Sequence, residues 1–295
     1  MSLGRGCYDA GVGVPTRLWR SGLAWIGAAL CLSPLGAGAR GTVGAPPGAS
    51  VTAPPASQVP VSRPRRAERP VPFNVGETLE YDVSWSSLLT AGTATLKVED
   101  KRPSFGSTAY YVYAEGRPTP LIARFYPVYY KLDTLLDVYT LLPQRAASYS
   151  DEHGQKKLNV VRFNRGAGTA DYEVQSSTPT KNRLLVPPLT EDALSAVMAV
   201  RATPLLEGGR ITMPVVERGV LYTMKVTVGA KELVATGAGR FTAWRLKPTV
   251  VDAEGRELAR GIALWISDDA RRLPVRLEAE LAVGRFVLLL KSVTP

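Results

Sequence analysis

Apolar and polar residues alternate in short runs along most of the chain after residue 72, which is the period of a half-buried β-strand. The segment 79–85 (LEYDVSW) is the clearest case, because Leu79, Tyr81, Val83 and Trp85 all fall on one side. We therefore expect Trp85 to be buried in a sheet. The same alternation predicts further strands at 94–98, 110–114, 160–163, 222–228, 244–247, 273–281 and 286–290.

Strand follows strand with little helix between them, which favours an antiparallel sheet over βαβ units. One segment, 191–201, has helical spacing: Thr190 is the expected N-cap, and Leu194, Val197 and Met198 share a face. This face is too apolar to lie in water, so it should pack on the sheet. The predicted fold is mainly β, a curved antiparallel sheet or half-open barrel with one packed helix, in a single domain over 71–295.

The first 39 residues have the order of a secretory signal peptide. Arg17 and Arg20 precede a short apolar run, a break follows at Pro34, and the small residues 37–39 (AGA) form a cleavage site. The run is too short to span a bilayer comfortably, because about 20 apolar residues are needed. We expect residues 1–39 to be removed and the mature protein to be exported, to the periplasm or to association with the outer membrane.

Residues 40–70 are rich in Pro, Ala and Gly and almost free of aromatic residues, which predicts a disordered linker. Its end, 63–70 (RPRRAERP), is basic and could provide a peripheral contact with a membrane. The whole chain has a net charge of +10, but the residues after the linker hold 28 Lys and Arg against 24 Asp and Glu. Since the excess charge lies mostly before the domain, we predict no nucleic-acid partner.

Several stretches resemble the bacterial domain-of-unknown-function family 3108. The similarity is carried by 73–85 (FNVGETLEYDVSW), 91–94 (AGTA), 192–195 (DALS), 264–269 (LWISDD) and 272–275 (RLPV). The resemblance implies an exported antiparallel β protein of the cell envelope, similar in outline to lipoprotein-carrier and lipocalin-like half barrels. It implies no activity and no catalytic residue that could be carried over to this chain.

The residues after the signal peptide contain no cysteine, which excludes disulfides, thiolate metal sites and cysteine nucleophiles there. His153 is the only histidine and lies in a polar segment typical of a hairpin turn, so we predict no metal site and no cofactor. The segment 237–241 (GAGRF) precedes a predicted strand and is interpreted as a hairpin turn rather than a phosphate loop. We assign no catalytic residue.

Tyrosines crowd the segment 110–130, with basic residues among them. Most should pack within the sheet, while the functional alternative is an apolar wall with a cationic rim, suited to an amphiphile with an acidic head group. On that alternative the predicted ligand-binding residues are Tyr113, Arg124, Tyr130 and Met198.

Three functions stay open at this stage. The leading hypothesis is a non-catalytic envelope module that binds a lipid or other amphiphile, or an envelope protein. The second is an envelope carbohydrate hydrolase that uses two of the carboxylates Glu77, Asp82, Asp133, Asp137 and Asp268, and the third is a structural scaffold. A large apolar cavity would favour the first, a polar cleft with two facing carboxylates the second, and a filled interior the third.

Overall fold

The computed structural model describes residues 66–86, 89–259, 261–281 and 284–295. The predicted signal peptide (1–39) and most of the predicted linker (40–65) lie outside the described residues.

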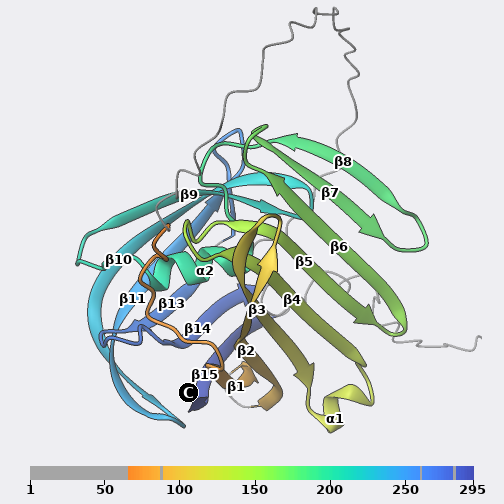
Figure 1. Ribbon diagram of the computed structural model, residues 1–295. Helices are drawn as coiled ribbons and strands as arrows, with labels where there is room; N and C mark the ends of the chain where they lie inside the picture. Colours follow the sequence, from red (N-terminus) through yellow and green to blue (C-terminus); the bar gives the residue numbers. More distant parts are fainter. Residues whose placement is uncertain (1–65, 87–88, 260, 282–283) are drawn as a thin grey trace, which may run out of the picture.

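One antiparallel sheet forms nearly the whole domain, and two short helices accompany it (Figure 1). The helices are α1 (Pro120–Ala123) and α2 (Ala193–Arg201). The strands are β1 (Thr78–Trp85), β2 (Leu89–Ser104), β3 (Ser107–Pro118), β4 (Val128–Asp137), β5 (Pro143–Glu152), β6 (Gln155–Asn164), β7 (Thr169–Gln175), β8 (Thr180–Leu185), β9 (Arg210–Glu217), β10 (Val220–Thr236), β11 (Gly239–Val251), β12 (Glu257–Ala259), β13 (Ala263–Ser267), β14 (Pro274–Leu281) and β15 (Gly284–Thr294).

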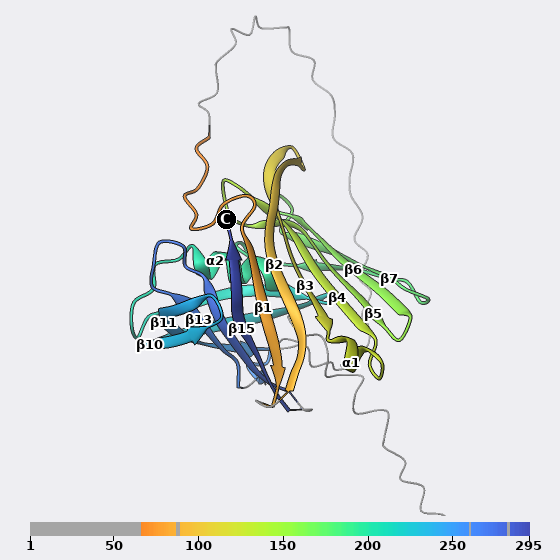
Figure 2. The same cartoon turned by 90° about the horizontal axis from the view of Figure 1, so that it is seen from below.

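The strands follow the order β8-β7-β6-β5-β4-β3-β2-β1-β15-β14-β13-β11-β10-β9, with β12 paired to β11. The chain therefore builds two meanders that meet where β1 pairs with β15. The sheet curves strongly, as the view from below shows (Figure 2), and its end strands β8 and β9 do not pair with each other. The expected curved antiparallel sheet is confirmed.

Two contacts bring the ends of this open sheet together. The backbone of Glu191 forms a parallel bridge with Val215, so the segment after β8 pairs with the edge of β9. The β9–β10 turn also meets β7, because Gly219 (φ 75°) lies so close to the Tyr172 ring that a Cβ atom there would be 2.5 Å from it. Glycine is therefore required at 219 for both its conformation and its size.

Helix α2 lies inside the curve of the sheet, between the two meanders (Figure 1). Leu194 and Met198 belong to a core shared with β1, β2, β3, β14 and β15. Ala196 and Val200 belong to a second core with β9, β10, β11 and β13. Because both sides of the helix are buried, α2 fills the middle of the half barrel rather than lying over an apolar cavity.

A buried arginine fixes the end of this helix. The guanidinium of Arg201 donates to both oxygens of Glu77, at 2.8 and 3.1 Å, and to the carbonyl oxygens of Arg271 and Arg272. It also lies 5.4 Å from the centre of the Phe73 ring. The side chain of Arg201 has no exposed surface, so these bonds replace all of its hydration.

The strands and the helix that the sequence predicts are present, the structure adds α1 and further strands, and two details of the predicted elements are wrong. Trp85 is only half-buried and stacks on Phe286 at 6.2 Å, because a β-bulge after Val83 interrupts the alternation. Helix α2 begins two residues later than expected. Its N-cap is Asp192, in a capping box with Ser195, since the preceding residue is held in extended conformation by its bridge to β9.

The last residues of the predicted linker contact the domain. The amide of Arg69 donates to the carbonyl oxygen of Val138, Glu68 pairs with Lys101 at 2.5 Å, and Arg66 lies over the Tyr139 ring at 5.1 Å. These contacts place the basic end of the linker along one rim of the sheet.

Replacing Arg201 by Met should lower the free energy of unfolding by about 3–5 kcal/mol, because it leaves the Glu77 carboxylate buried without its counter-charge. Urea denaturation followed by circular dichroism measures the change. The double variant Glu77→Gln with Arg201→Met should recover part of the loss. A loss below about 1 kcal/mol in the single variant would contradict the role given to this ion pair.

Candidate functional site

A cleft of about 860 Å³ lies at one end of the sheet, and we call it the rim cleft. Three turns meet there, at 105–106 between β2 and β3, 138–142 between β4 and β5, and 165–168 between β6 and β7. The segment 186–189, which leaves β8, crosses the same end. The cleft depends on the antiparallel order of the strands, because that order brings alternate turns to one rim.

Two of the lining side chains are large, apolar and exposed. Phe105 is 64% exposed and Leu189 is 65% exposed. Both have left-handed backbone conformations, with φ of 46° and 62°. Phe105 precedes Gly106 in a two-residue hairpin turn with two positive φ angles, where Asn or Asp is normally preferred. A bulky residue in this conformation lowers the free energy of unfolding by on the order of 1 kcal/mol. Folding alone does not favour such a residue, so its presence points to a functional role.

The charged residues that line the cleft are two aspartates and three arginines. The carboxylate of Asp137 accepts hydrogen bonds from Ser107, Thr140 and Gln144. The carboxylate of Asp171 accepts one from Arg183. Burial alone would raise the pKa of Asp137, but the bonds from Ser107 and the 139–140 turn hold it below its ordinary value. The remaining charged groups are three arginines: Arg66, Arg162 and Arg165.

These arginines differ in how much of their charge is neutralised. Arg162 lies 3.3 Å from Glu173, whereas Arg66 and Arg165 form no ion pair with the described residues. Arg165 is held in place, because its Nη2 donates to the carbonyl oxygens of Pro143 and Thr190. Its guanidinium also covers the Phe163 ring at 4.6 Å. The cleft therefore combines an apolar wall with a fixed positive charge.

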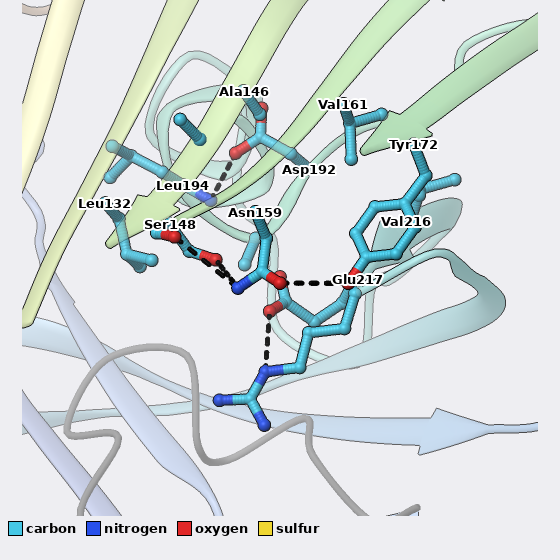
Figure 3. Close-up of a pocket in the computed structure, with 13 residues that line it drawn as sticks. Leu132, Ala146, Ser148, Asn159, Val161, Tyr172, Asp192, Leu194, Val216 and Glu217 are labelled. Carbon is cyan, nitrogen blue, oxygen red and sulfur yellow. Dashed lines mark hydrogen bonds and ion pairs between the residues drawn. The ribbon is translucent and has the colours of Figure 1, made fainter. Parts of the chain in front are cut away.

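A second, polar hollow lies inside the sheet next to the start of α2, and we call it the inner chamber (Figure 3). Asn159 lies at its centre, where its Nδ2 donates to Ser148 Oγ at 3.0 Å and its Oδ1 accepts from Tyr172 at 3.0 Å. Glu217 lies on another side, 3.7 Å from Arg218. The volume of about 20 Å³ suffices for about one or two water molecules.

The buried carboxyl groups of Asp192 and Glu217 line the inner chamber, and the buried Glu191 precedes Asp192 in the chain. Burial raises the pKa of Glu217 to about 7, against the attraction of Arg218, and raises the pKa of Glu191 to about 8. Burial also raises the pKa of Asp192, although that carboxylate accepts bonds from Thr134 and from the first amides of α2. Around neutral pH the chamber therefore keeps part of its carboxyl groups protonated.

The family model described as "Protein of unknown function (DUF3108)" matches residues 80–291, which include almost all of the sheet. The chain belongs to this family. No curated protein matches it.

Three solved structures are similar to this DUF3108 domain in fold. A beta-barrel-like protein of domain-of-unknown-function family 1849 from Brucella abortus has a TM-score of 0.45 at 8% identity, over 74% of this chain and 97% of its own. A candidate exported protein with a YmcC-like fold from Bacteroides fragilis has 0.33 at 11%, over 78% and 100%. A candidate lipoprotein from Parabacteroides distasonis has 0.29 at 9%, over 76% and 98%.

The four residues predicted to bind a ligand lie in different parts of the DUF3108 domain. Tyr113 is on the outer face of β3, beneath the ammonium group of Lys131 at 4.6 Å, and Arg124 is exposed at the end of α1. Tyr130 is half-buried on β4, where burial and Glu152 raise its pKa. Met198 is fully buried in α2. The structure brings none of the four into the rim cleft, and their binding role stays a prediction.

The described residues contain no group of three or more His, Cys, Asp or Glu side chains arranged to hold a metal ion. In the same part of the chain, no helix has the length and apolar content needed to cross a bilayer.

The stability of the domain should fall as the pH rises from about 5 to about 8. Glu191 and Glu217 have an ordinary pKa of 4.5 in the unfolded chain and raised values of about 8 and about 7 when folded. In that window the folded state keeps protons that the unfolded state has released, so raising the pH favours unfolding. Chemical denaturation should give a free energy of unfolding that is lower at pH 8 than at pH 5 by on the order of 5 kcal/mol.

The matched control is the double variant Glu191→Gln with Glu217→Gln, whose stability should depend much less on pH in this window. A wild-type stability that rises between pH 5 and pH 8 would contradict the assignment of raised pKa values to these two groups.

Proposed function

We propose that this domain is a non-catalytic binding module of the cell envelope that holds an amphiphile with an anionic head group in the rim cleft. The observation that carries the proposal is the meeting of exposed apolar side chains with unpaired arginines in one hollow of about 860 Å³. Small-molecule sites typically have volumes of about 300–1,000 Å³, mostly apolar walls and a few polar groups. The N-terminal sequence pattern supports export of the protein.

The apolar part of the amphiphile would lie against Phe105 and Leu189, with Phe163 and Val186 behind them. Covering these exposed surfaces would gain roughly 25 cal/mol for each Å² removed from water. The backbone strain at Phe105 and Leu189 supports this assignment, because a turn made only for folding would favour Asn or Gly there.

The anionic head group would meet Arg66 and Arg165, the two arginines of the cleft that form no ion pair with the described residues. Guanidinium groups bind carboxylates and phosphates through paired hydrogen bonds. The buried Oε1 atom of Gln144 also lines the cleft and has no hydrogen-bond partner in the described residues. A hydroxyl group near the ligand's head would satisfy it.

Carbohydrate hydrolysis is less well supported. The carboxylates considered from the sequence have structural partners: Glu77 binds Arg201, Asp133 binds Arg145, and Asp268 binds Lys231. Asp192 and Glu217 do share the inner chamber, but a volume of about 20 Å³ does not admit a sugar ring. The interior contains α2 where a substrate would have to lie.

Protein stripped of bound lipid should bind a fluorescent fatty acid saturably, and the Phe105→Asn variant should bind it about tenfold more weakly. The loss follows from removing an aromatic contact worth roughly 1–2 kcal/mol. Because Asn suits this turn, the same variant should be as stable as the wild type or about 1 kcal/mol more stable. Fluorescence titration and urea denaturation of the same samples test both parts.

Two further variants test whether binding depends on the charge of the head group and on the rim cleft. Arg66→Gln should weaken binding of the fatty acid but not of its methyl ester, while Leu206→Ser, which changes an exposed leucine outside the cleft, should have no effect. Absence of saturable binding in folded wild-type protein, or equal binding by wild type and Phe105→Asn, would overturn the proposal.

A further inference from the structure

The helix α1 forms a small tip at the end of the sheet opposite to the rim cleft (Figure 1). It connects β3 to β4, with Thr119 as N-cap and Pro120 in its first turn. The turn between β5 and β6 lies beside it, because the amide of His153 donates to the carbonyl oxygen of Pro127 at 3.0 Å and the Tyr126 and His153 rings are 6.3 Å apart. The tip is therefore a supported part of the fold.

Two large apolar side chains at this tip point into solvent. Leu121 is 59% exposed and Phe125 is 69% exposed. They are four positions apart in one helical turn, which the amides of Phe125 and Tyr126 extend by donating to the carbonyl oxygen of Ile122. No other two large exposed apolar side chains of the described residues share a helical turn. Neither side chain packs on the core.

Cations flank these apolar side chains. Arg124 lies between them, and Lys156 and Lys157 follow the neighbouring turn; all three are exposed and form no ion pair with the described residues. Two carboxylates lie in the same turn: Asp151 accepts from the amide of Gly154, and Glu152 lies against Tyr130. These contacts do not neutralise the two carboxylates, but the three cations outnumber them, so the net charge of the tip is positive.

We infer that this tip, formed by Leu121, Arg124 and Phe125 together with Lys156 and Lys157, docks on an anionic lipid surface. Apolar side chains flanked by Lys and Arg insert into the region between head groups and acyl chains, while the cations bind the anionic head groups. The inference uses no residue of the rim cleft, so it stands or falls independently of ligand binding there.

Fluorescence from a dye at a single site tests the inference. The chain contains no cysteine after residue 31, so one cysteine introduced into the domain can be labelled selectively in protein without the signal peptide. A polarity-sensitive dye is attached through Phe125→Cys and, as the matched control, through Leu233→Cys, a leucine of β10 that is 71% exposed. With vesicles containing phosphatidylglycerol, we expect the dye at 125 to brighten at least twofold and shift to shorter wavelength. The dye at 233 should not respond, and neither should respond to phosphatidylcholine vesicles.

Flotation with the same anionic vesicles gives the second readout. The Leu121→Ser, Phe125→Ser double variant and the Arg124→Gln variant should each reduce the bound fraction at least threefold. These residues are exposed, so the folded sheet should remain unchanged by circular dichroism. The inference is overturned if wild-type protein does not bind, if both dyes respond equally, or if binding is lost only when the basic segment 63–69 is neutralised.

Discussion

The buried ion pair between Arg201 and Glu77 is the interaction on which the rest of this structure depends. A guanidinium without exposed surface is tolerated only when all its donors have partners, and here two carboxylate oxygens, two carbonyl oxygens and the sulfur of Met198 provide them. The bonds join α2 to the start of β1 and to the turn before β14. Since β1 and β14 both neighbour β15, the helix is fixed at the junction of the two meanders, and its two faces complete both cores.

A filled interior determines where a ligand can be held. In a half barrel the concave face is the usual place for an apolar ligand, but here α2 occupies it and the inner chamber has room only for water. The turns at one rim provide the larger hollow instead. Two residues that break local rules lie there: Phe105 and Leu189 have left-handed conformations that cost energy, and they expose apolar surface. The rigid sheet holds these turns in position, which is a common division of roles between scaffold and loops.

The sequence pattern predicted many of the strands that have one buried and one exposed face, but not β7, although its residues alternate too. Strands without alternation give a weaker signal. All five residues of β13 are buried, so they do not alternate, while the edge strand β8 is exposed at most positions. Pro214 within β9 is unfavourable for a central strand, although an edge position tolerates it. The turns that form the rim cleft are spread over more than 80 residues of sequence. Periodicity within a strand gives no information on which turns lie together in the fold, so the cleft could not be predicted. The one local signal was Phe105 before Gly106, a turn position where an aromatic residue is unfavourable.

Hydrogen–deuterium exchange with and without a saturating fatty acid tests the central claim most directly, because it locates the ligand without any substitution. We expect slower exchange in the turns at 104–107, 139–144 and 164–168 and in the segment 186–190. Exchange in α2 should be unchanged, because the helix stays packed between its two cores. Faster exchange in α2, or protection around the inner chamber with an unchanged rim, would show that the helix moves aside and that the ligand enters the half barrel.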